Sequence, residues 1–286
     1  MDIQILSQPF LINSDFALRL GMIVNQRLAE GKSLYPGMGE KQNTPKAGYD
    51  EDGEIVLMDH TWYVKELKTS SNKTFPTVSI QGTMTRYGYC SYGNEDYIQQ
   101  IQLLDKDSDV KGIILSMDSY GGTVDSTQEL ADAVRNAKKP VVAYVKHAAC
   151  SAAYFVASQA DRIVMSSETT AIVGSIGVLM VYENIREMLE KQGVHVEIIR
   201  DAESIDKAKP NSIEPLTDAE RQELIDSMSG IKETFKSYVK QGRAGVLKSS
   251  EVFTGKTYGP KDALKLGLVD KVGTIKDAYT LIKSIS

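Results

Sequence analysis

The sequence predicts an α/β fold built on a mostly parallel sheet. From residue 76 onward, apolar runs with strand character alternate with amphipathic helical segments. The first of these are a strand-like run at 76–84, a helical run at 96–107, and a strand at 110–117 that is apolar on both faces in its middle. Strands that alternate with helices are typical of parallel sheets with helical crossovers.

The alternation continues toward the C-terminus. Expected helices are 123–139, 152–160 and 184–193, and expected strands are 140–145 and 194–200. A long helix is expected at 217–242, because Thr217 and Glu220 form a capping box and an apolar face follows. This face packs on the core or, alternatively, is partly buried against another subunit. Its residues are Leu224, Ile225, Met228, Ile231, Phe235 and Tyr238.

The N-terminal part differs from the rest of the chain in its residue pattern. An amphipathic helix is expected at 14–31, followed by a Gly-, Pro- and charge-rich loop at 35–54. We therefore divide the chain into residues 1–75, a helix plus linker, and residues 76–286, the main domain. The first part is either an extra layer on the core or a separable segment, a docking arm or a piece removed by self-cleavage.

Composition excludes several classes of function. The net charge of −5 argues against nucleic acid as a main partner. Cys90 and Cys150 give neither a disulfide framework nor zinc spacing, so no metal or cofactor is expected and a reducing compartment fits. The first residues lack a signal-peptide pattern, and no apolar run is long enough to span a bilayer. We expect no membrane partner.

Two short segments are candidates for chemistry. Gly121 and Gly122 end the segment SMDSYGG after the strand at 110–117, where a sharp turn would leave N–H groups facing an anion or a carbonyl oxygen. The alternative is a plain strand-to-helix turn. Ser151 lies between a strand and the alanine-rich helix at 152–160, where its hydroxyl meets the positive helix end. The alternative for Ser151 is a simple N-cap.

A nucleophilic serine needs a base. The histidines are His60 in the N-terminal part, His147 four residues before Ser151, and His195 in an expected strand. None has an acidic partner that would complete a triad. The other option is a lysine kept neutral by burial, and Lys207 and Lys209 are both candidates that spacing alone does not separate.

Four signatures, in order, resemble the signal peptide peptidase A (protease IV) family of Ser–Lys peptidases. They are SYGG at 119–122, CSAAYFVAS at 150–158, VGSIGVLM at 173–180 and GLVDKVG at 267–273. The resemblance covers about residues 76–280, with Tyr120 in place of the family's proline. It implies a Clp peptidase/crotonase-like core, a repeated β-β-α spiral with an N-terminal helical extension.

The resemblance also assigns roles. Ser151 would be the nucleophile. Counting back from Glu214-Pro215-Leu216 makes Lys207 the equivalent of the family's base. The preceding residues Ser204-Ile205-Asp206 depart from the family's usual sequence. The N–H groups of Gly122 and Ala152 would hold the oxyanion, with Gly121 in the same turn. Cys150 would be a packing residue.

A single copy without a membrane segment resembles the bacteriophage head-maturation branch. This implies a serine endopeptidase that cleaves scaffold, capsid or portal protein, in a ring or other closed homo-oligomer, in the host cytoplasm or inside the assembling prohead. Contact surfaces are expected on 217–242 and near 275–284. One alternative is a cytoplasmic bacterial peptidase that clears peptide fragments. Others are a catalytically silent scaffold component and a crotonase-type acyl-coenzyme A enzyme.

Overall fold

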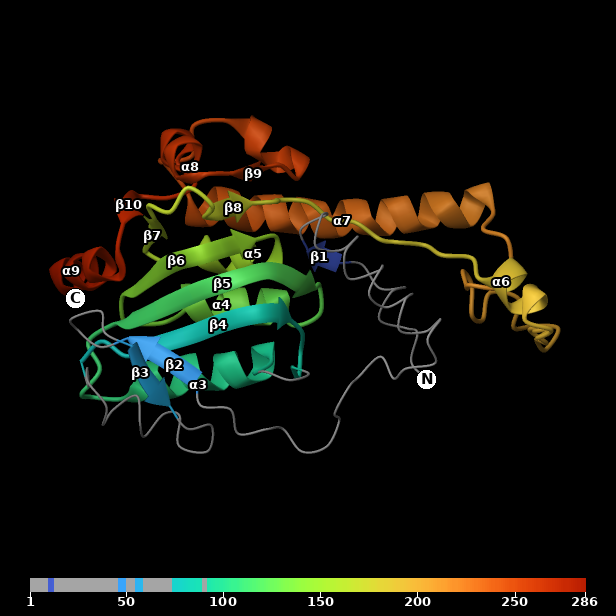
Figure 1. The fold of residues 1–286 in the computed structure, drawn as a ribbon, viewed down its shortest axis with the longest axis horizontal. Coiled ribbons are helices and arrows are strands. Elements are labelled where there is room, and N and C mark those ends of the chain that lie inside the picture. The colour runs from blue at the N-terminus through green and yellow to red at the C-terminus, as the bar shows by residue number, and fades with distance from the viewer. Residues whose placement is uncertain (1–9, 13–45, 50–54, 59–73, 89–91) are drawn as a thin grey trace.

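The computed structural model describes residues 10–12, 46–49, 55–58, 74–88 and 92–286 (Figure 1). The expected helix at 14–31 lies outside the described residues. Within the expected loop at 35–54, Lys46–Tyr49 instead forms strand β2, which pairs antiparallel with β3 (Ile55–Met58). The β2 strand also contacts the main sheet at β4 (Thr77–Met84).

The main sheet is mostly parallel, as the alternation of strands and helices predicts. Strands β4, β5, β6 and β7 pair in parallel, β10 pairs in parallel with β7, and β8 pairs in parallel with the end of β6. Only two short strands run antiparallel in the described sheet, β1 on β5 and β9 on β8. The other strands are β1 (Phe10–Ile12), β5 (Ile113–Thr123), β6 (Val141–Cys150), β7 (Arg162–Ser166), β8 (Ile172–Gly174), β9 (Thr257–Tyr258) and β10 (Lys271–Gly273). The α/β class is confirmed.

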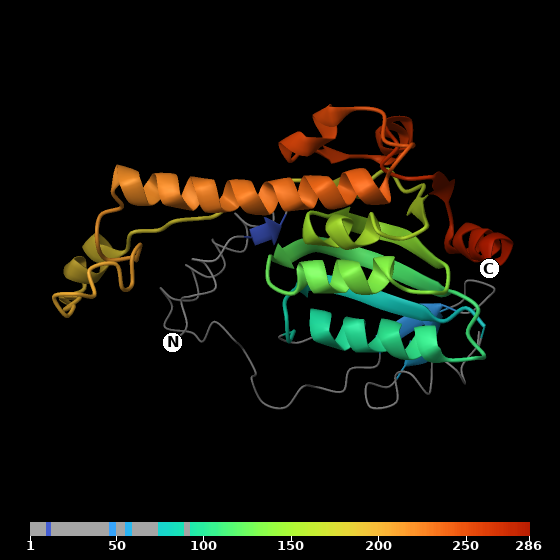
Figure 2. The same cartoon turned by 180° about the vertical axis from the view of Figure 1, so that it is seen from behind.

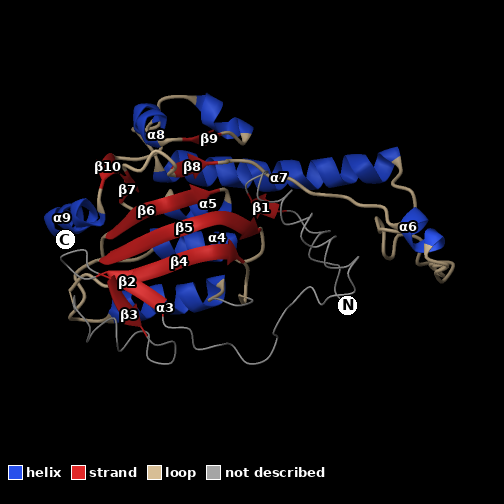
Figure 3. Ribbon diagram, in the orientation of Figure 1, coloured by secondary structure: helices blue, strands red, loops and turns tan. Residues whose placement is uncertain are grey.

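Helices cover both faces of this sheet (Figures 2 and 3). On one face, α3, α4, α5 and the end of α7 enclose the larger core; on the other, α9 encloses a smaller one. The helices are α3 (Asn94–Lys106), α4 (Thr127–Arg135), α5 (Ala152–Ala157), α6 (Arg186–Lys191), α7 (Asp218–Gly242), α8 (Pro260–Leu266) and α9 (Ile275–Ile285), with a 3-10 turn at Ser250–Thr254. No helix in the described part of the chain could cross a bilayer.

The two cores follow from the alternation of side chains along a strand. In β5, Ile113 and Leu115 belong to the larger core, whereas Ile114 between them belongs to the smaller one. In β6, Ala143 belongs to the larger core and its neighbour Val142 to the smaller one. Successive side chains of a strand point to opposite faces, so a strand covered on both faces is apolar at every position. This explains the continuous apolar run expected at 110–117.

Helix α7 begins where the capping box predicts. Thr217 Oγ1 accepts a hydrogen bond from the Glu220 N–H (3.2 Å), and the Glu220 carboxylate accepts one from the Thr217 N–H (2.8 Å). Its buried residues all lie near its C-terminus, at Phe235, Tyr238 and Val239. The rest of the helix projects past the sheet edge (Figure 1).

The projecting part of α7 belongs to an extended segment, residues 177–234, which we call the arm. All of these residues are described, and none of them is fully buried. The arm contains α6 and runs out along α7 and back (Figures 1 and 2). The strand expected at 194–200 is wrong, because this stretch forms no strand, is mostly exposed and pairs with none of the described strands.

Candidate active site

Ser151 stands at the junction of β6 and α5. Its backbone has φ 55° and ψ −119°, a conformation that L-residues with a side chain rarely adopt. Such strained junctions persist where the surrounding structure enforces them, and they cluster at functional sites. Two hydrogen bonds fix this residue: its N–H donates to the Gly174 carbonyl, and its own carbonyl accepts from the Phe155 N–H, both at 2.8 Å.

The Ser151 hydroxyl is buried and has no hydrogen-bond partner among the described residues. The N-cap alternative requires that this hydroxyl accept a bond from the first turn of α5, and no such bond exists. Buried hydroxyls are normally satisfied, because an unpaired one costs about 1–3 kcal/mol. The unpaired Oγ is therefore the unusual feature of this site.

The signature at 173–180 packs directly beside Ser151. Strand β8 pairs with the end of β6 and places Gly174 opposite Cys150. Gly174 has φ 108°, and a Cβ there would lie 2.8 Å from the Lys256 carbonyl oxygen. A glycine is thus needed at this position, and its carbonyl holds Ser151 in place.

The signature at 267–273 supports the same site from behind. Tyr154, within α5, donates its hydroxyl to the Leu268 carbonyl (2.7 Å). Asp270 accepts two hydrogen bonds from the buried Arg243 guanidinium (both 2.9 Å) and one from the Ile163 N–H (2.7 Å). These contacts tie α5, α7 and β7 to one loop, so the loop fixes the helix that follows the serine.

The glycine pair lies in the last residues of β5 rather than in a turn after a strand that ends at 117. Gly121 has φ 103°, and a Cβ on Gly122 would lie 1.8 Å from the Met84 carbonyl oxygen. Gly121 donates its N–H to Ser119 Oγ (3.1 Å), and Ser119 Oγ donates to the Gly82 carbonyl (2.5 Å). The expected turn is wrong in this detail, because β4 continues beside β5 and keeps it extended to Thr123.

Cys150 is the other nucleophile type beside Ser151. Its side chain is fully buried, and this burial raises the pKa of the thiol to about 12. A thiol is reactive as the thiolate, so at neutral pH Cys150 is an inert packing residue, as expected from the sequence.

No described histidine forms a hydrogen bond with the Ser151 hydroxyl. His147 Nε2 shares a hydrogen bond with the Tyr120 hydroxyl (3.0 Å), and the two rings meet edge to face. His195 is exposed on the arm, and His60 lies outside the described residues. Among the described residues no group of three or more His, Cys, Asp or Glu side chains could hold a metal ion.

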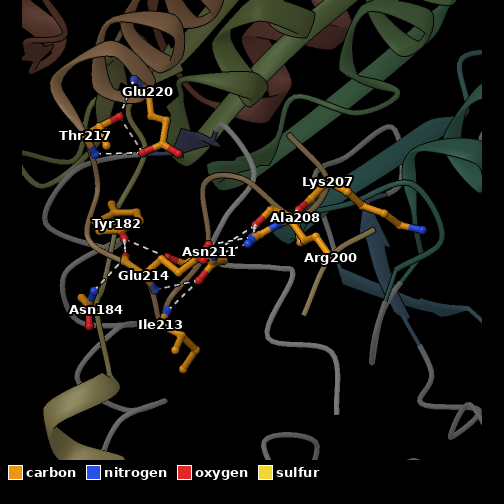
Figure 4. Close-up of polar contacts among 10 residues, drawn as sticks. All are labelled: Tyr182, Asn184, Arg200, Lys207, Ala208, Asn211, Ile213, Glu214, Thr217 and Glu220. Atoms are coloured by element: carbon orange, nitrogen blue, oxygen red, sulfur yellow. Dashed lines mark hydrogen bonds and ion pairs between the residues drawn. The ribbon is translucent and has the colours of Figure 1, made fainter. Parts of the chain in front are cut away.

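Lys207 and Lys209 lie on the arm, and both are exposed. A cluster of polar side chains holds the loop that contains them (Figure 4). Arg200 pairs with both carboxylate oxygens of Glu214 (2.8 and 2.6 Å) and also donates to the Lys207 carbonyl (2.5 Å). Asn211 also donates to Glu214 (2.6 Å). These bonds from Arg200 and Asn211 lower the pKa of Glu214 to about 2.

The side chain of Lys207 extends away from this cluster (Figure 4). Its backbone takes part in the loop, because its N–H donates to the Ser204 carbonyl (3.1 Å) and its own carbonyl accepts from Arg200. Its side-chain amine forms no hydrogen bond or ion pair within the described chain. Within one copy, therefore, the structure does not bring the exposed Lys207 to the buried Ser151. Gly122 lies at the end of β5, and Ala152 is the first residue of α5, directly after the serine. Sequence reasoning found these residues but missed the arm, whose clearest signal is a set of apolar residues between charged ones at 194–205.

Comparison with known proteins gives a consistent result. The model of peptidase family S49 matches residues 133–285, more than half of the chain. A putative protease of Methanocaldococcus jannaschii is 36% identical over 196 residues, 66% of this chain and 61% of that protein. The capsid assembly protease C of Escherichia phage lambda is 31% identical over 67% of this chain and 43% of that protein. The chain thus spans about half to three fifths of these relatives.

Solved structures are more distant. A mutant of the 1510-N membrane-bound stomatin-specific protease is 18% identical with a TM-score of 0.49, over 73% of this chain and 83% of that one. A ClpP1 mutant from Listeria monocytogenes is 16% identical with a TM-score of 0.45, over 71% and 94%.

Proposed function

The chain belongs to peptidase family S49, and we propose that it is a serine endopeptidase with Ser151 as nucleophile and Lys207 as general base. The observation that carries this proposal is the Ser151 hydroxyl, which is buried, unpaired among the described residues, and held on a strained junction. A nucleophile needs a hydroxyl that no structural hydrogen bond occupies.

The proposed reaction follows from the groups around Ser151. A neutral lysine amine takes the hydroxyl proton as Oγ attacks the scissile carbonyl carbon, and the carbonyl oxygen becomes an oxyanion. The N–H groups of Gly122 and Ala152 stabilise this oxyanion, each by about 3 kcal/mol. Gly121 shapes the strand end and donates to Ser119 instead. The amine returns the proton to the leaving nitrogen, and water then hydrolyses the acyl-enzyme.

The base is proposed to come from a second copy of the chain. Ser151 lies in the packed core, whereas Lys207 lies on an arm that projects past its own sheet (Figure 1). Large apolar side chains on this arm face solvent, with Ile199 86% and Ile205 62% exposed. Exposed apolar groups in such a patch are typical of an interface. A homo-oligomer would bury them and bring the amine to a neighbouring serine.

The proposed substrates are head proteins of a bacteriophage: scaffold, capsid or portal. Two phage relatives support this, the lambda protease and a head-tail preconnector protein of phage P21 that is 26% identical over 66% of this chain and 38% of that protein. The reaction would take place in the host cytoplasm, inside the assembling prohead. The archaeal relative favours the second candidate, a cellular peptidase that clears peptide fragments.

Labelling with a serine-directed fluorophosphonate tests the chemistry. The full chain should be labelled on Ser151 and should hydrolyse peptides, and Ser151→Ala should lose both properties. Labelling at another residue, or none in an assembled sample, would contradict the proposal. To separate the two substrates, purified scaffold or capsid protein and short peptides are compared. A phage maturation enzyme cuts the folded head protein at few positions, whereas a clearing peptidase prefers short peptides.

A further inference from the structure

The short strand β1 occupies an edge of β5 at the candidate active site. It pairs antiparallel with the last three residues of β5. The pairing joins Phe10 to Thr123, Leu11 to Gly122 and Ile12 to Gly121. A segment more than a hundred residues away in sequence thus lies along the glycine pair (Figure 1).

The two edges of β5 can be told apart by their partners. Strand β4 occupies one edge as far as Gly122, which pairs with Met84. Strand β6 occupies the other edge, but its last pair with β5 is Ala149 with Ser119. Because a strand has only two edges, β1 must lie on the edge that β6 leaves after this pair. Strand β6 ends at Cys150, directly before Ser151, so β1 takes the place beside β5 that β6 gives up just before the serine.

We propose that β1 is an internal occupant of the substrate-binding edge and holds the described chain in a latent state. This rests on the proposed function, in which the Gly122 N–H receives the oxyanion. A substrate carbonyl that reaches both this N–H and Ser151 has to lie where β1 lies. One edge pairs with one strand at a time, so β1 and a substrate exclude each other. The complete burial of Ser151 agrees with a closed site.

The same pairing indicates a class of substrate. The occupant is an extended segment, antiparallel to β5, with the apolar sequence Phe-Leu-Ile. Main-chain pairing along a strand edge binds any extended polypeptide, and alternate side chains then set specificity. The substrate edge therefore takes extended apolar segments, which folded proteins expose only in unpaired strands or in flexible regions.

An internal occupant competes with substrate in a measurable way. If the edge is free in about a tenth of molecules, the apparent KM rises about tenfold, because substrate binds only the free fraction. The turnover number kcat is unchanged, since bound substrate has already displaced β1. Loss of β1 pairing should therefore lower KM and leave kcat unaltered.

The test uses the full chain with Leu11→Pro and Ile12→Pro together, since proline lacks the N–H that a strand donates and disrupts pairing. The matched control places the same two prolines at Ile5 and Leu6, outside β1. Peptide hydrolysis gives KM and kcat. In parallel, hydrogen exchange of the Gly122 and Thr123 amides is measured in the Ser151→Ala background, which reports on the pairing without any catalysis.

We expect the β1 prolines to lower KM about tenfold at constant kcat and to speed exchange at Gly122 and Thr123, while the control prolines change neither. Unchanged exchange would overturn the pairing, and faster exchange with an unchanged KM would overturn the latent state. If no variant hydrolyses peptide although exchange accelerates, the proposed peptidase function fails and the pairing of β1 with β5 stands.

Discussion

Two regions of the molecule hold the proposed dyad, and they are built in opposite ways. Ser151 lies in the core, fixed by backbone bonds from β8 and α5 and supported by the loop at 267–273. Lys207 lies on an arm without a single fully buried residue. A packed core positions a group on its own, whereas an exposed arm acquires a fixed position only against a partner. This difference is the reason for the proposal that Ser151 of one copy works with Lys207 of another.

The largest effect on activity is expected at Ser151, the residue of the proposed dyad that lies in the core. Ser151→Ala should reduce peptide hydrolysis by at least about 10⁴-fold, because the nucleophile is lost. The melting temperature should not fall, since Ser151 Oγ makes no hydrogen bond with the described residues. Cys150→Ala serves as the neighbouring control and should remain active. An active serine variant beside an inactive cysteine variant would reverse the assignment.

On the arm, Lys207→Ala should lose activity to a similar extent and still fold, because this exposed amine forms no hydrogen bond or ion pair within the described chain. Lys207→Arg should also be inactive, since a guanidinium stays protonated and accepts no proton. Lys209→Ala, two residues away and equally exposed, should retain most activity. A dead Lys209 variant beside a working Lys207 variant would shift the base by two residues.

The apolar surface of the arm should control assembly. Ile199→Asp with Ile205→Asp should dissociate the oligomer in sedimentation, and activity should fall by more than about tenfold as sites lose their base. Leu264→Asp is the matched control, an exposed apolar residue on α8 outside the arm. Full activity from a monomeric double variant would show that one copy holds the whole site.

The smallest effect concerns the fold of the arm itself. Arg200 and Asn211 depress the Glu214 pKa to about 2, so the contact contributes fully above the ordinary value of 4.5 and is lost as the pH falls toward 2. NMR of arm amides in the Ser151→Ala background should show this loosening. Glu214→Gln should remove the pH dependence and lower activity a few-fold at neutral pH, whereas Glu223→Gln, an exposed carboxylate of α7, should change neither. An unchanged transition in Glu214→Gln would assign it to another group.

The sheet could be predicted from the sequence because its signal is local. Apolar positions alternate with polar ones in β4 and lie in nearly continuous runs at the start of β5 and β6. The Thr217–Glu220 box marks the start of α7 within a residue. The small residues around Ser151 and the glycines near it also pointed to one site. Each of these patterns reports the packing of a segment against its own sheet.

The arm and the end of β5 could not be predicted in the same way. The stretch 194–200 alternates like a strand, but a strand needs a neighbour, and none of the described strands pairs with it. Gly121 and Gly122 looked like a turn, yet Met84 of β4 continues alongside and keeps them extended. The pairing of β1 joins segments far apart in the chain. These features depend on partners in space, which local periodicity does not encode.

Mixing two inactive proteins tests the central claim most directly. Ser151→Ala and Lys207→Ala are combined in equal amounts, dissociated, reassembled and assayed on one peptide. If the base comes from a second copy, about a quarter of the sites pair an intact serine with an intact lysine, and about a quarter of the original activity returns. A mixture that assembles and stays inactive would contradict the account, because each copy would then have to supply its own base.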